Sequence, residues 1–290
     1  MIYAIISDIH SNIQALETAL DIIKGKGINN IICLGDIVGY NANPSECVEL
    51  IRSTSQVKHI IQGNHDYDAA RFGNMRMEDV MGLSKDAFDG ITYSAGKLND
   101  KDKKWLSCLP TVKYVEDPHI KFMIVHGSIM DQWGYILSKL DAVTALNELK
   151  ALKAQLGFFG HTHLPTFVRG NINKEEDRVL FDDVKINLYQ GKMSDCEIYP
   201  GEMEFESFYT IEDDYYLFNP GSIGQARNNG FTSFGVLDTE KRTFEIEGFK
   251  YDWKAAQKAV QKEDYSGSIA FRLDPEYDTK RKIKSKFRTW

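Results

Sequence analysis

Five short motifs that contain histidine, aspartate or asparagine recur along this chain, and each of them follows an apolar run. Such runs, for example residues 122–125 before the fourth motif, are typical of buried strands. Strands that end at the same edge of a sheet direct their polar residues into one pocket, so we expect the five motifs to form a single site. The motifs are Asp8-Ile9-His10, Gly35-Asp36, Gly63-Asn64-His65-Asp66, His126-Gly127 and Gly160-His161-Thr162-His163.

The side chains in these motifs are of the kinds that bind metal ions. Asp8 and His10 are two positions apart, so both project to the same side of an extended segment, and His161 and His163 repeat that spacing. Asp36 has two carboxylate oxygens and could contact two ions. The motifs contain no cysteine, and carboxylate, amide and imidazole ligands suit manganese, iron, zinc or nickel better than a thiolate-bound structural zinc.

Composition narrows the class of protein. The chain of 290 residues is long enough for one large globular domain, with or without an appendage. A net charge of −7 and a pI near 5.6 argue against general affinity for nucleic acid backbones. The four cysteines form neither a zinc pattern nor a disulfide framework. Since the first predicted strand begins at Ile2 and no apolar run is long enough to cross a bilayer, we expect a cytoplasmic protein without a membrane partner.

The first part of the chain alternates between predicted strands and helices. The pattern Ser11-Asn12-Ile13-Gln14 is a capping box that begins a helix after the first strand, and Pro44 begins a second helix. This β-α-β-α-β order predicts parallel strands with right-handed crossovers. Residues 140–156 are amphipathic at helical spacing, and residues 205–248 are predicted to be rich in antiparallel strands.

One main domain and a short C-terminal part are expected. We predict a domain over residues 1–250, followed by a C-terminal helix and a basic tail over residues 251–290. Residues 171–214 are acidic and depart from the alternation around them, so we interpret them as an insertion. The insertion could govern substrate choice, form a homo-oligomer or be a passive loop. The charge run at the end of the chain is typical of a solvated tail.

Taken together, the five motifs resemble the calcineurin-like metallophosphoesterase superfamily, whose pattern is D-x-H, G-D, G-N-H-[DE], a histidine before glycine, and G-H-x-H in that order. The resemblance spans roughly residues 1–248 and points to the small bacterial phosphodiesterase-like branch, whose hallmarks also resemble Asn219-Pro220-Gly221-Ser222. It implies an α/β fold of four layers, a metallophosphoesterase sandwich of two packed mixed sheets flanked by helices.

The resemblance also implies two divalent metal ions as cofactors, with manganese as the first candidate and iron, zinc or nickel as alternatives. All seven positions that bind metal in the family pattern are filled in this chain. The first ion would be bound by Asp8, His10 and His163, the second by Asn64, His126 and His161, and Asp36 would bridge them.

Two further motif residues would be catalytic rather than metal-binding. By resemblance, His65 would face the substrate and donate to a phosphate oxygen or to the leaving group, and Asp66 would orient it.

The candidate substrate-binding residues follow from a position where this sequence differs from the better-known members of the superfamily. Protein phosphatases and dinucleoside tetraphosphatases of the superfamily carry Arg-Gly soon after Gly-Asp, where this chain has Gly39-Tyr40-Asn41. Arg227 is the candidate replacement, because a guanidinium fork fits a pair of phosphate oxygens. Tyr40 and Asn219 are the other two candidates.

The implied function is a dinuclear-metal-dependent phosphoesterase that hydrolyses a phosphodiester, with a small nucleotide-type diester as the guess for the substrate. The mechanism that the resemblance implies is attack on phosphorus by a hydroxide that bridges the two metals. Three alternatives stay open: a phosphomonoesterase, a nuclease, or a catalytically weak binding scaffold of the same fold, as in a retromer subunit. The expected partner is a small phosphate ester, and the acidic balance makes nucleic acid a poor fit.

Overall fold

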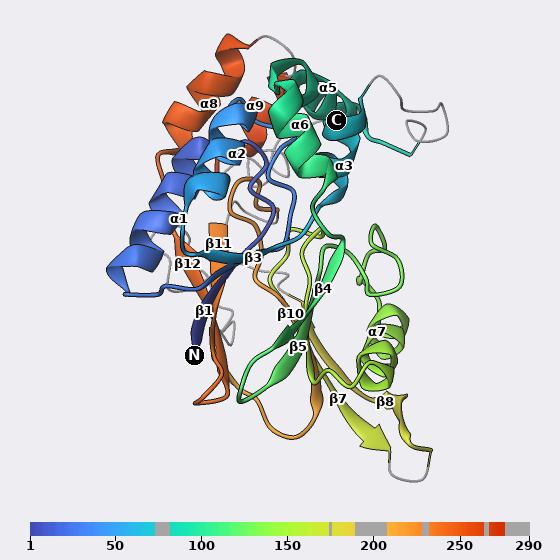
Figure 1. Cartoon of the computed structure of the whole chain (residues 1–290). Helices are drawn as coiled ribbons and strands as arrows, with labels where there is room; N and C mark the ends of the chain where they lie inside the picture. Colours follow the sequence, from blue (N-terminus) through green and yellow to red (C-terminus); the bar gives the residue numbers. More distant parts are fainter. Residues whose placement is uncertain (73–81, 174–175, 189–207, 228–231, 264–266, 276–290) are drawn as a thin grey trace, which may run out of the picture.

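The computed structural model describes residues 1–72, 82–173, 176–188, 208–227, 232–263 and 267–275. Within them, two sheets of six strands lie face to face (Figure 1). The first sheet contains, in spatial order, β3 (Val57–Ile60), β2 (Ile31–Cys33), β1 (Ile2–Ile6), β11 (Thr232–Asp238), β12 (Thr243–Phe249) and β9 (Phe208–Thr210). The second contains β4 (Val112–Glu116), β5 (Lys121–Val125), β6 (Leu156–Phe158), β10 (Tyr215–Asn219), β7 (Thr166–Asn173) and β8 (Arg178–Leu188).

Strand β1 shows how alternation along a strand produces two separate cores. Tyr3 and Ile5 belong to the apolar cluster between the two sheets, whereas Ala4 and Ile6 belong to the cluster between the first sheet and its helices. All four side chains are buried. A strand that is apolar on both faces is therefore central in a layered α/β fold.

Helices cover the outer faces of both sheets (Figure 1). Those that share a core with the first sheet are α1 (Ile13–Gly25), α2 (Pro44–Ser53), α3 (Asn64–Arg71), α5 (Lys85–Lys97) and α6 (Asp100–Ser107). The second sheet is covered by α7 (Lys139–Ala151), and α8 (Trp253–Lys262) and α9 (Gly267–Arg272) pack beside α5. This succession of helices, two mixed sheets and a further helix confirms the predicted four-layered α/β sandwich.

Several local predictions can be compared with these elements. The first three strands are parallel, and α2 begins at Pro44, as predicted. Asn12, rather than Ser11, caps α1, because its side chain accepts a hydrogen bond from the amide of Ala15. Residues 205–248 are not all antiparallel, since β10 pairs in parallel with β6 and antiparallel with β7. Long-range pairing, which local periodicity does not encode, decides the direction of β10.

The segment interpreted as an insertion contributes to both sheets. Residues 171–173 end β7, β8 extends the second sheet, and β9 forms an edge of the first. Val179 and Val184 of β8 are buried against α7. Residues 189–207 and the basic stretch 280–290 lie outside the described residues. In the part of the chain that the structure describes, no helix has both the length and the apolar character that a membrane span requires.

Candidate metal centre

The five motifs meet at one edge of the two sheets. Strands β1, β2 and β3 of the first sheet and β5 and β6 of the second lead into them. The amide of Asp8 donates to the carbonyl of Gly35 at 3.1 Å, and the amide of Gly160 donates to the carbonyl of His126 at 2.8 Å. The two sheets are joined where the amide of His161 donates to Oδ1 of Asp8 at 3.2 Å. The loops that carry the predicted ligands are thus bonded to one another.

Two clusters of buried ligand-type side chains result, in each of which one ligand atom per residue lies within 4.8 Å of the others. The first metal cluster contains Asp8, His10, Asp36 and His163, and the second metal cluster contains Asp36, His126 and His161. Asp36 belongs to both, with Oδ2 at 3.5 Å from Nε2 of His10 and 3.3 Å from Nε2 of His126. A carboxylate in this position can bridge two ions.

In the first metal cluster, two imidazole nitrogens face each other at short distance. Nδ1 of His10 lies 3.0 Å from the carbonyl oxygen of Val38, and Nδ1 of His163 lies 2.6 Å from that of Gln225, so each Nδ1 carries the proton that it donates. The two Nε2 atoms, 2.9 Å apart, are then both unprotonated acceptors. A cation between them would turn this repulsion into coordination, so these residues fit a metal ion.

The second metal cluster has the same chemistry. Nδ1 of His126 donates to the carbonyl of Leu34 at 2.8 Å, and its Nε2 lies 3.2 Å from Oδ1 of Asn64 and 3.3 Å from Oδ2 of Asp36. Oδ2 of Asp8 and Nε2 of His161 are buried without a hydrogen-bond partner in the described residues. Buried polar atoms are normally satisfied, so these orphaned acceptors indicate a ligand that accepts their electron pairs.

Burial and mutual charge set the pKa values of these groups. Burial raises the pKa of Asp8 to about 7. Burial also acts to raise the pKa of Asp36, but His126 and His65 hold it well below its usual value. Burial acts to lower the pKa of His126, yet the carboxylates raise it to about 9. Burial lowers the pKa of His161 to about 3, which keeps this imidazole in the neutral form that binds metal. The carboxylates of Asp8 and Asp36 therefore favour a positive charge between the two clusters.

Backbone strain is concentrated at the same place. Asp8, His10, Asp36, His161 and His163, five of the seven predicted ligands, have φ values between 49° and 63°. This left-handed conformation costs a non-glycine residue roughly 1–2 kcal/mol and persists only where the surroundings impose it. Such strain is typical of functional sites.

His65 lies at the start of α3, directly after Asn64. Its ring is buried, with centroid distances of 4.8 Å to His10 and 4.7 Å to Tyr40. Its amide donates to Oδ1 of Asp36 at 2.9 Å, and its Nδ1 has no partner among the described residues. The imidazole is therefore held beside the first metal cluster without being one of its ligands.

Asp66 is fully buried and binds backbone amides. Its Oδ1 accepts from Ile37 at 2.9 Å and Val38 at 3.1 Å, and its Oδ2 accepts from Gly63 at 3.1 Å. Within the described residues it makes no hydrogen bond with His65, the residue that it was predicted to orient. The contacts support a positioning role toward the loops that carry the metal ligands, and a catalytic role for Asp66 stays a prediction.

Two of the predicted substrate-binding residues adjoin the clusters. Tyr40 is buried, and its ring packs against His10, His65 and His163 at centroid distances of 4.7, 4.7 and 6.4 Å. Arg227 is exposed, and after burial its charge is the largest contribution to the lowered pKa of His163. Contact of either residue with a substrate stays a prediction.

Asn219 is placed differently. Its Nδ2 donates to the carbonyl of Gly160 at 2.8 Å and to Oγ1 of Thr162 at 3.0 Å, and its Oδ1 accepts from the amide of Gly221 at 2.9 Å. The side chain is fully buried. It positions the loop that carries two of the histidines, and its contact with substrate stays a prediction.

Comparison with known proteins identifies the family. A calcineurin-like phosphoesterase superfamily domain matches residues 1–242. The chain belongs to this superfamily. The resemblance drawn from the five motifs is therefore confirmed, and the superfamily is metal-dependent, which agrees with the buried aspartate and histidine clusters.

The similarity to known proteins extends over nearly the whole chain. An uncharacterized protein from Methanocaldococcus jannaschii is 33% identical over 263 residues, which are 89% of this chain and 91% of the relative. The crystal structure of a metallophosphoesterase from Sphaerobacter thermophilus has a TM-score of 0.70 and 26% identity, covering 94% of this chain and 98% of that one. A hypothetical protein from Pyrococcus horikoshii OT3 shares the fold, with a TM-score of 0.69 and 17% identity over 94% and 97% of the two chains.

Two side-chain contacts at the candidate metal centre were not specified by the sequence analysis. Oγ of Ser222 donates to the carbonyl of Asp8 at 2.9 Å, and the motif that begins at Asn219 could have pointed to it. Tyr135 stacks on His161, with ring centroids 4.0 Å apart and planes inclined by 25°. It lies in an irregular loop, where no periodicity indicates which side chains meet.

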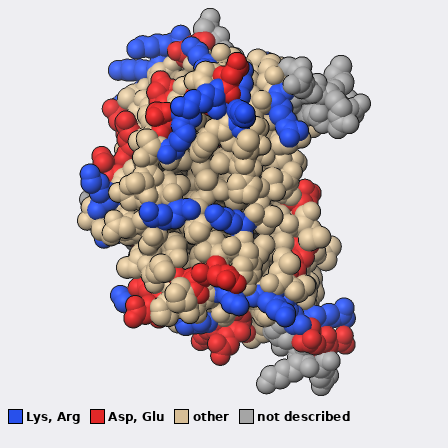
Figure 2. All heavy atoms as spheres, in the orientation of Figure 1, with Lys and Arg blue, Asp and Glu red and all other residues tan. Residues whose placement is uncertain are grey.

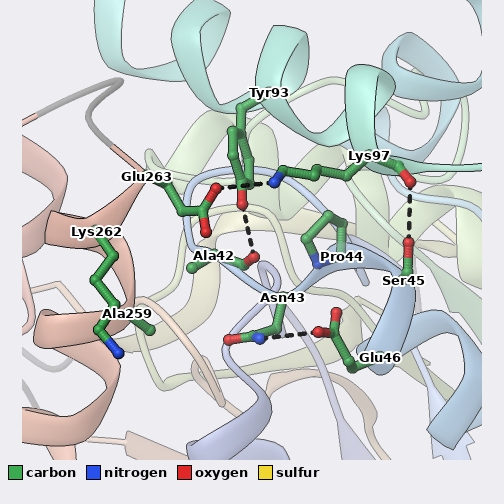
Figure 3. Close-up of a pocket in the computed structure, with 10 residues that line it drawn as sticks. All are labelled: Ala42, Asn43, Pro44, Ser45, Glu46, Tyr93, Lys97, Ala259, Lys262 and Glu263. Atoms are coloured by element: carbon green, nitrogen blue, oxygen red, sulfur yellow. Dashed lines mark hydrogen bonds and ion pairs between the residues drawn. The ribbon is translucent and has the colours of Figure 1, made fainter.

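A cavity of about 280 Å³ lies elsewhere, between the N-terminus of α2, α5 and α8 (Figure 3). It is crossed by an ion pair between Lys97 and Glu263 at 2.9 Å and by a hydrogen bond from Tyr93 to the carbonyl of Ala42 at 3.0 Å. None of its lining residues belongs to the metal clusters. The cavity therefore adds nothing to the metal centre.

Replacing Asp66 with alanine is expected to destabilise the fold. Each amide left without an acceptor costs about 1–3 kcal/mol when it is buried, and three amides depend on this carboxylate. Denaturant unfolding monitored by circular dichroism measures the loss. Asp66→Asn, which keeps one acceptor oxygen, should lose less. An alanine variant that unfolds at the denaturant concentration of the unaltered chain would contradict the positioning role.

Proposed function

We propose that this protein is a dinuclear-metal-dependent phosphodiesterase that hydrolyses a small, nucleotide-type diester. The observation that carries the proposal is the pair of buried clusters that share Asp36, with imidazole acceptors directed at one another. Membership of the superfamily supports phosphate-ester hydrolysis. The preference for a diester and the number of ions are our inference.

The clusters define which residues would hold the cations. Asp8, His10, Asp36 and His163 fit one ion, and Asp36, Asn64, His126 and His161 fit the other, with manganese as our first candidate. When bound, two cations supply Lewis acidity toward a phosphoryl oxygen and lower the pKa of water. The ligands hold their geometry because each Nδ1 of His10, His126 and His163 is bonded to a backbone carbonyl.

The remaining side chains would act on the substrate. The buried His65 can donate one N–H to a phosphoryl oxygen or to the leaving oxygen, where negative charge develops. Tyr40 packs on this imidazole and restricts its orientation. Arg227, exposed beside the clusters, can pair with a phosphate oxygen.

Charge favours a diester over a monoester. A phosphate monoester carries close to two negative charges at neutral pH, whereas a diester carries one. The position that holds arginine in phosphatases of the superfamily is occupied by Tyr40, an uncharged side chain whose pKa is raised mainly by burial, while the charge of Arg227 acts to lower it. Without an arginine at this position, the site has one cationic side chain fewer for a second phosphate charge, which supports a monoanionic substrate.

Surface charge supports a small substrate rather than a nucleic acid. On the face shown in Figure 2, the described Lys and Arg side chains are interspersed with Asp and Glu, without a continuous basic stripe. Together with the net charge of −7, this arrangement disfavours binding to a long polyanion.

The proposal also includes a cytoplasmic compartment and self-association of the chain. In the described residues Cys33, Cys47 and Cys108 are free thiols, which supports a reducing, cytoplasmic compartment. Self-association through residues 171–214 stays a proposal, and sedimentation of the full chain tests it.

A metal-loaded activity screen tests the function. Manganese-loaded protein would be assayed with aryl monoesters, aryl diesters, cyclic nucleotides, dinucleoside polyphosphates and single-stranded oligonucleotides. We expect kcat/KM to be highest among the small diesters. A preference for monoesters would identify a phosphomonoesterase, a preference for oligonucleotides would identify a nuclease, and no turnover of any ester would favour a binding scaffold.

A further inference from the structure

Tyr135 is an aromatic side chain at the rim of the metal centre. One face of its ring stacks on His161 of the second metal cluster, with centroids 4.0 Å apart. The side chain is nevertheless 47% exposed, whereas His161 is 7% exposed. Since one face of the ring lies against the imidazole, the exposed surface of Tyr135 lies on its other sides. An exposed aromatic residue therefore lies one ring away from a candidate metal ligand.

Exposed apolar residues are close to this ring in the sequence. Four of the ten exposed large apolar side chains in the described residues lie within one segment, namely Met130, Tyr135, Leu137 and Leu140. The same segment contains Trp133, whose ring lies 5.6 Å from that of Tyr67 on α3. An exposed aromatic ring beside a polar metal centre suits a ligand with one charged end and one flat apolar end.

The loop that carries the ring is held by its own hydrogen bonds. The amide of Gly127 donates to the carbonyl of Gln132 at 3.1 Å, and the amides of Ser128 and Gly134 donate to the carbonyl of Asp131 at 3.0 and 2.8 Å. A Cβ atom at Gly127 would lie 2.7 Å from two carbonyl oxygens of this loop, so the close turn requires glycine. The aromatic face is thus fixed relative to His126, the residue before the turn.

We propose that Tyr135 is the platform on which the aromatic group of the phosphate ester, a nucleobase or an aryl ring, stacks while its phosphate lies at the metal clusters. The inference rests on the proposed function and adds the substrate class that this site selects. The ring is one stacking distance from His161, so the aromatic group would be near the phosphate rather than on a remote surface. Stacking tolerates any base, because every base has an aromatic face.

Calorimetric binding of two monoesters to manganese-loaded protein tests the platform. Adenosine 5′-monophosphate and ribose 5-phosphate share the phosphate and differ by the base. In Tyr135→Leu, the Kd of adenosine 5′-monophosphate should rise about 5- to 150-fold, as expected for loss of one stacked base, while the Kd of ribose 5-phosphate stays unchanged. Tyr135→Trp should keep the preference for the base.

The controls separate the platform from other roles. Phe181, which is 52% exposed on β8, supplies a matched variant, Phe181→Leu, that should leave both Kd values unchanged. Equal weakening of both ligands, or loss of metal in Tyr135→Leu, would show that the ring positions His161 instead. Unchanged Kd values would also overturn the platform. The binding assay needs no turnover, so an inactive protein would refute the proposed function without deciding this inference.

Discussion

Replacing Asp36 with asparagine is expected to remove both metal ions from this protein, whereas the unaltered chain should approach two ions per chain when manganese is supplied. Asp36 is the residue common to the two metal clusters, and its Oδ2 lies within 3.5 Å of one imidazole in each. Asparagine keeps the shape and an oxygen that can accept from the amide of His65, but it removes the charge that balances two cations. Activity should fall about 10³-fold or more, because cations contribute several kcal/mol.

Metal analysis of the purified, manganese-loaded chains measures this outcome. Asp117 provides a matched control, because its carboxylate is also buried and hydrogen-bonded, to Tyr3 and His119, but belongs to neither cluster. Asp117→Asn should retain both ions. A chain that binds a single ion at saturating manganese, or an Asp36→Asn variant that still binds two, would refute the bridging role.

The gathering of the candidate ligands was predictable from sequence because each motif follows a predicted strand. Asp8 follows β1, His126 follows β5 and His161 follows β6. The apolar runs before these residues predict the strands. Parallel strands place their carboxyl ends at one edge, so order along the chain was enough to bring the ligands together. The family resemblance added which ligand belongs to which ion.

Other features depend on tertiary packing and had no local signal. Asp66 follows His65 in sequence, yet its carboxylate binds amides of the neighbouring loop, because a buried carboxylate takes the donors that the fold presents. Asn219 holds the loop after β6, a role that its motif did not indicate, and its contact with substrate stays a prediction. The stacking of Tyr135 joins two loops that share no sequence pattern. Sequence thus located the ligands, and only the fold showed what supports them.

Replacing His65 with alanine is expected to leave the metal content unchanged and to reduce kcat about 10²- to 10⁴-fold, the usual contribution of one positioned acid or hydrogen-bond donor. The bond from its amide to Asp36 does not involve the side chain, so the ligand shared by both clusters keeps its support. Burial lowers the pKa of His65, and a neutral imidazole still carries one N–H with which to donate. The lost donation would act on the transition state rather than on metal binding.

Kinetics and metal analysis on the same preparation decide this prediction. His119, an exposed histidine outside the five motifs, supplies the control, and His119→Ala should retain both turnover and metal. His65→Gln, which keeps an N–H donor, should retain more turnover than His65→Ala if hydrogen bonding is the main contribution. Loss of metal in His65→Ala would make this side chain a support of the clusters. Turnover near that of the unaltered chain, at saturating metal and substrate, would show that the donor which stabilises the departing oxygen lies elsewhere, with Tyr40 and Arg227 as the next residues to replace.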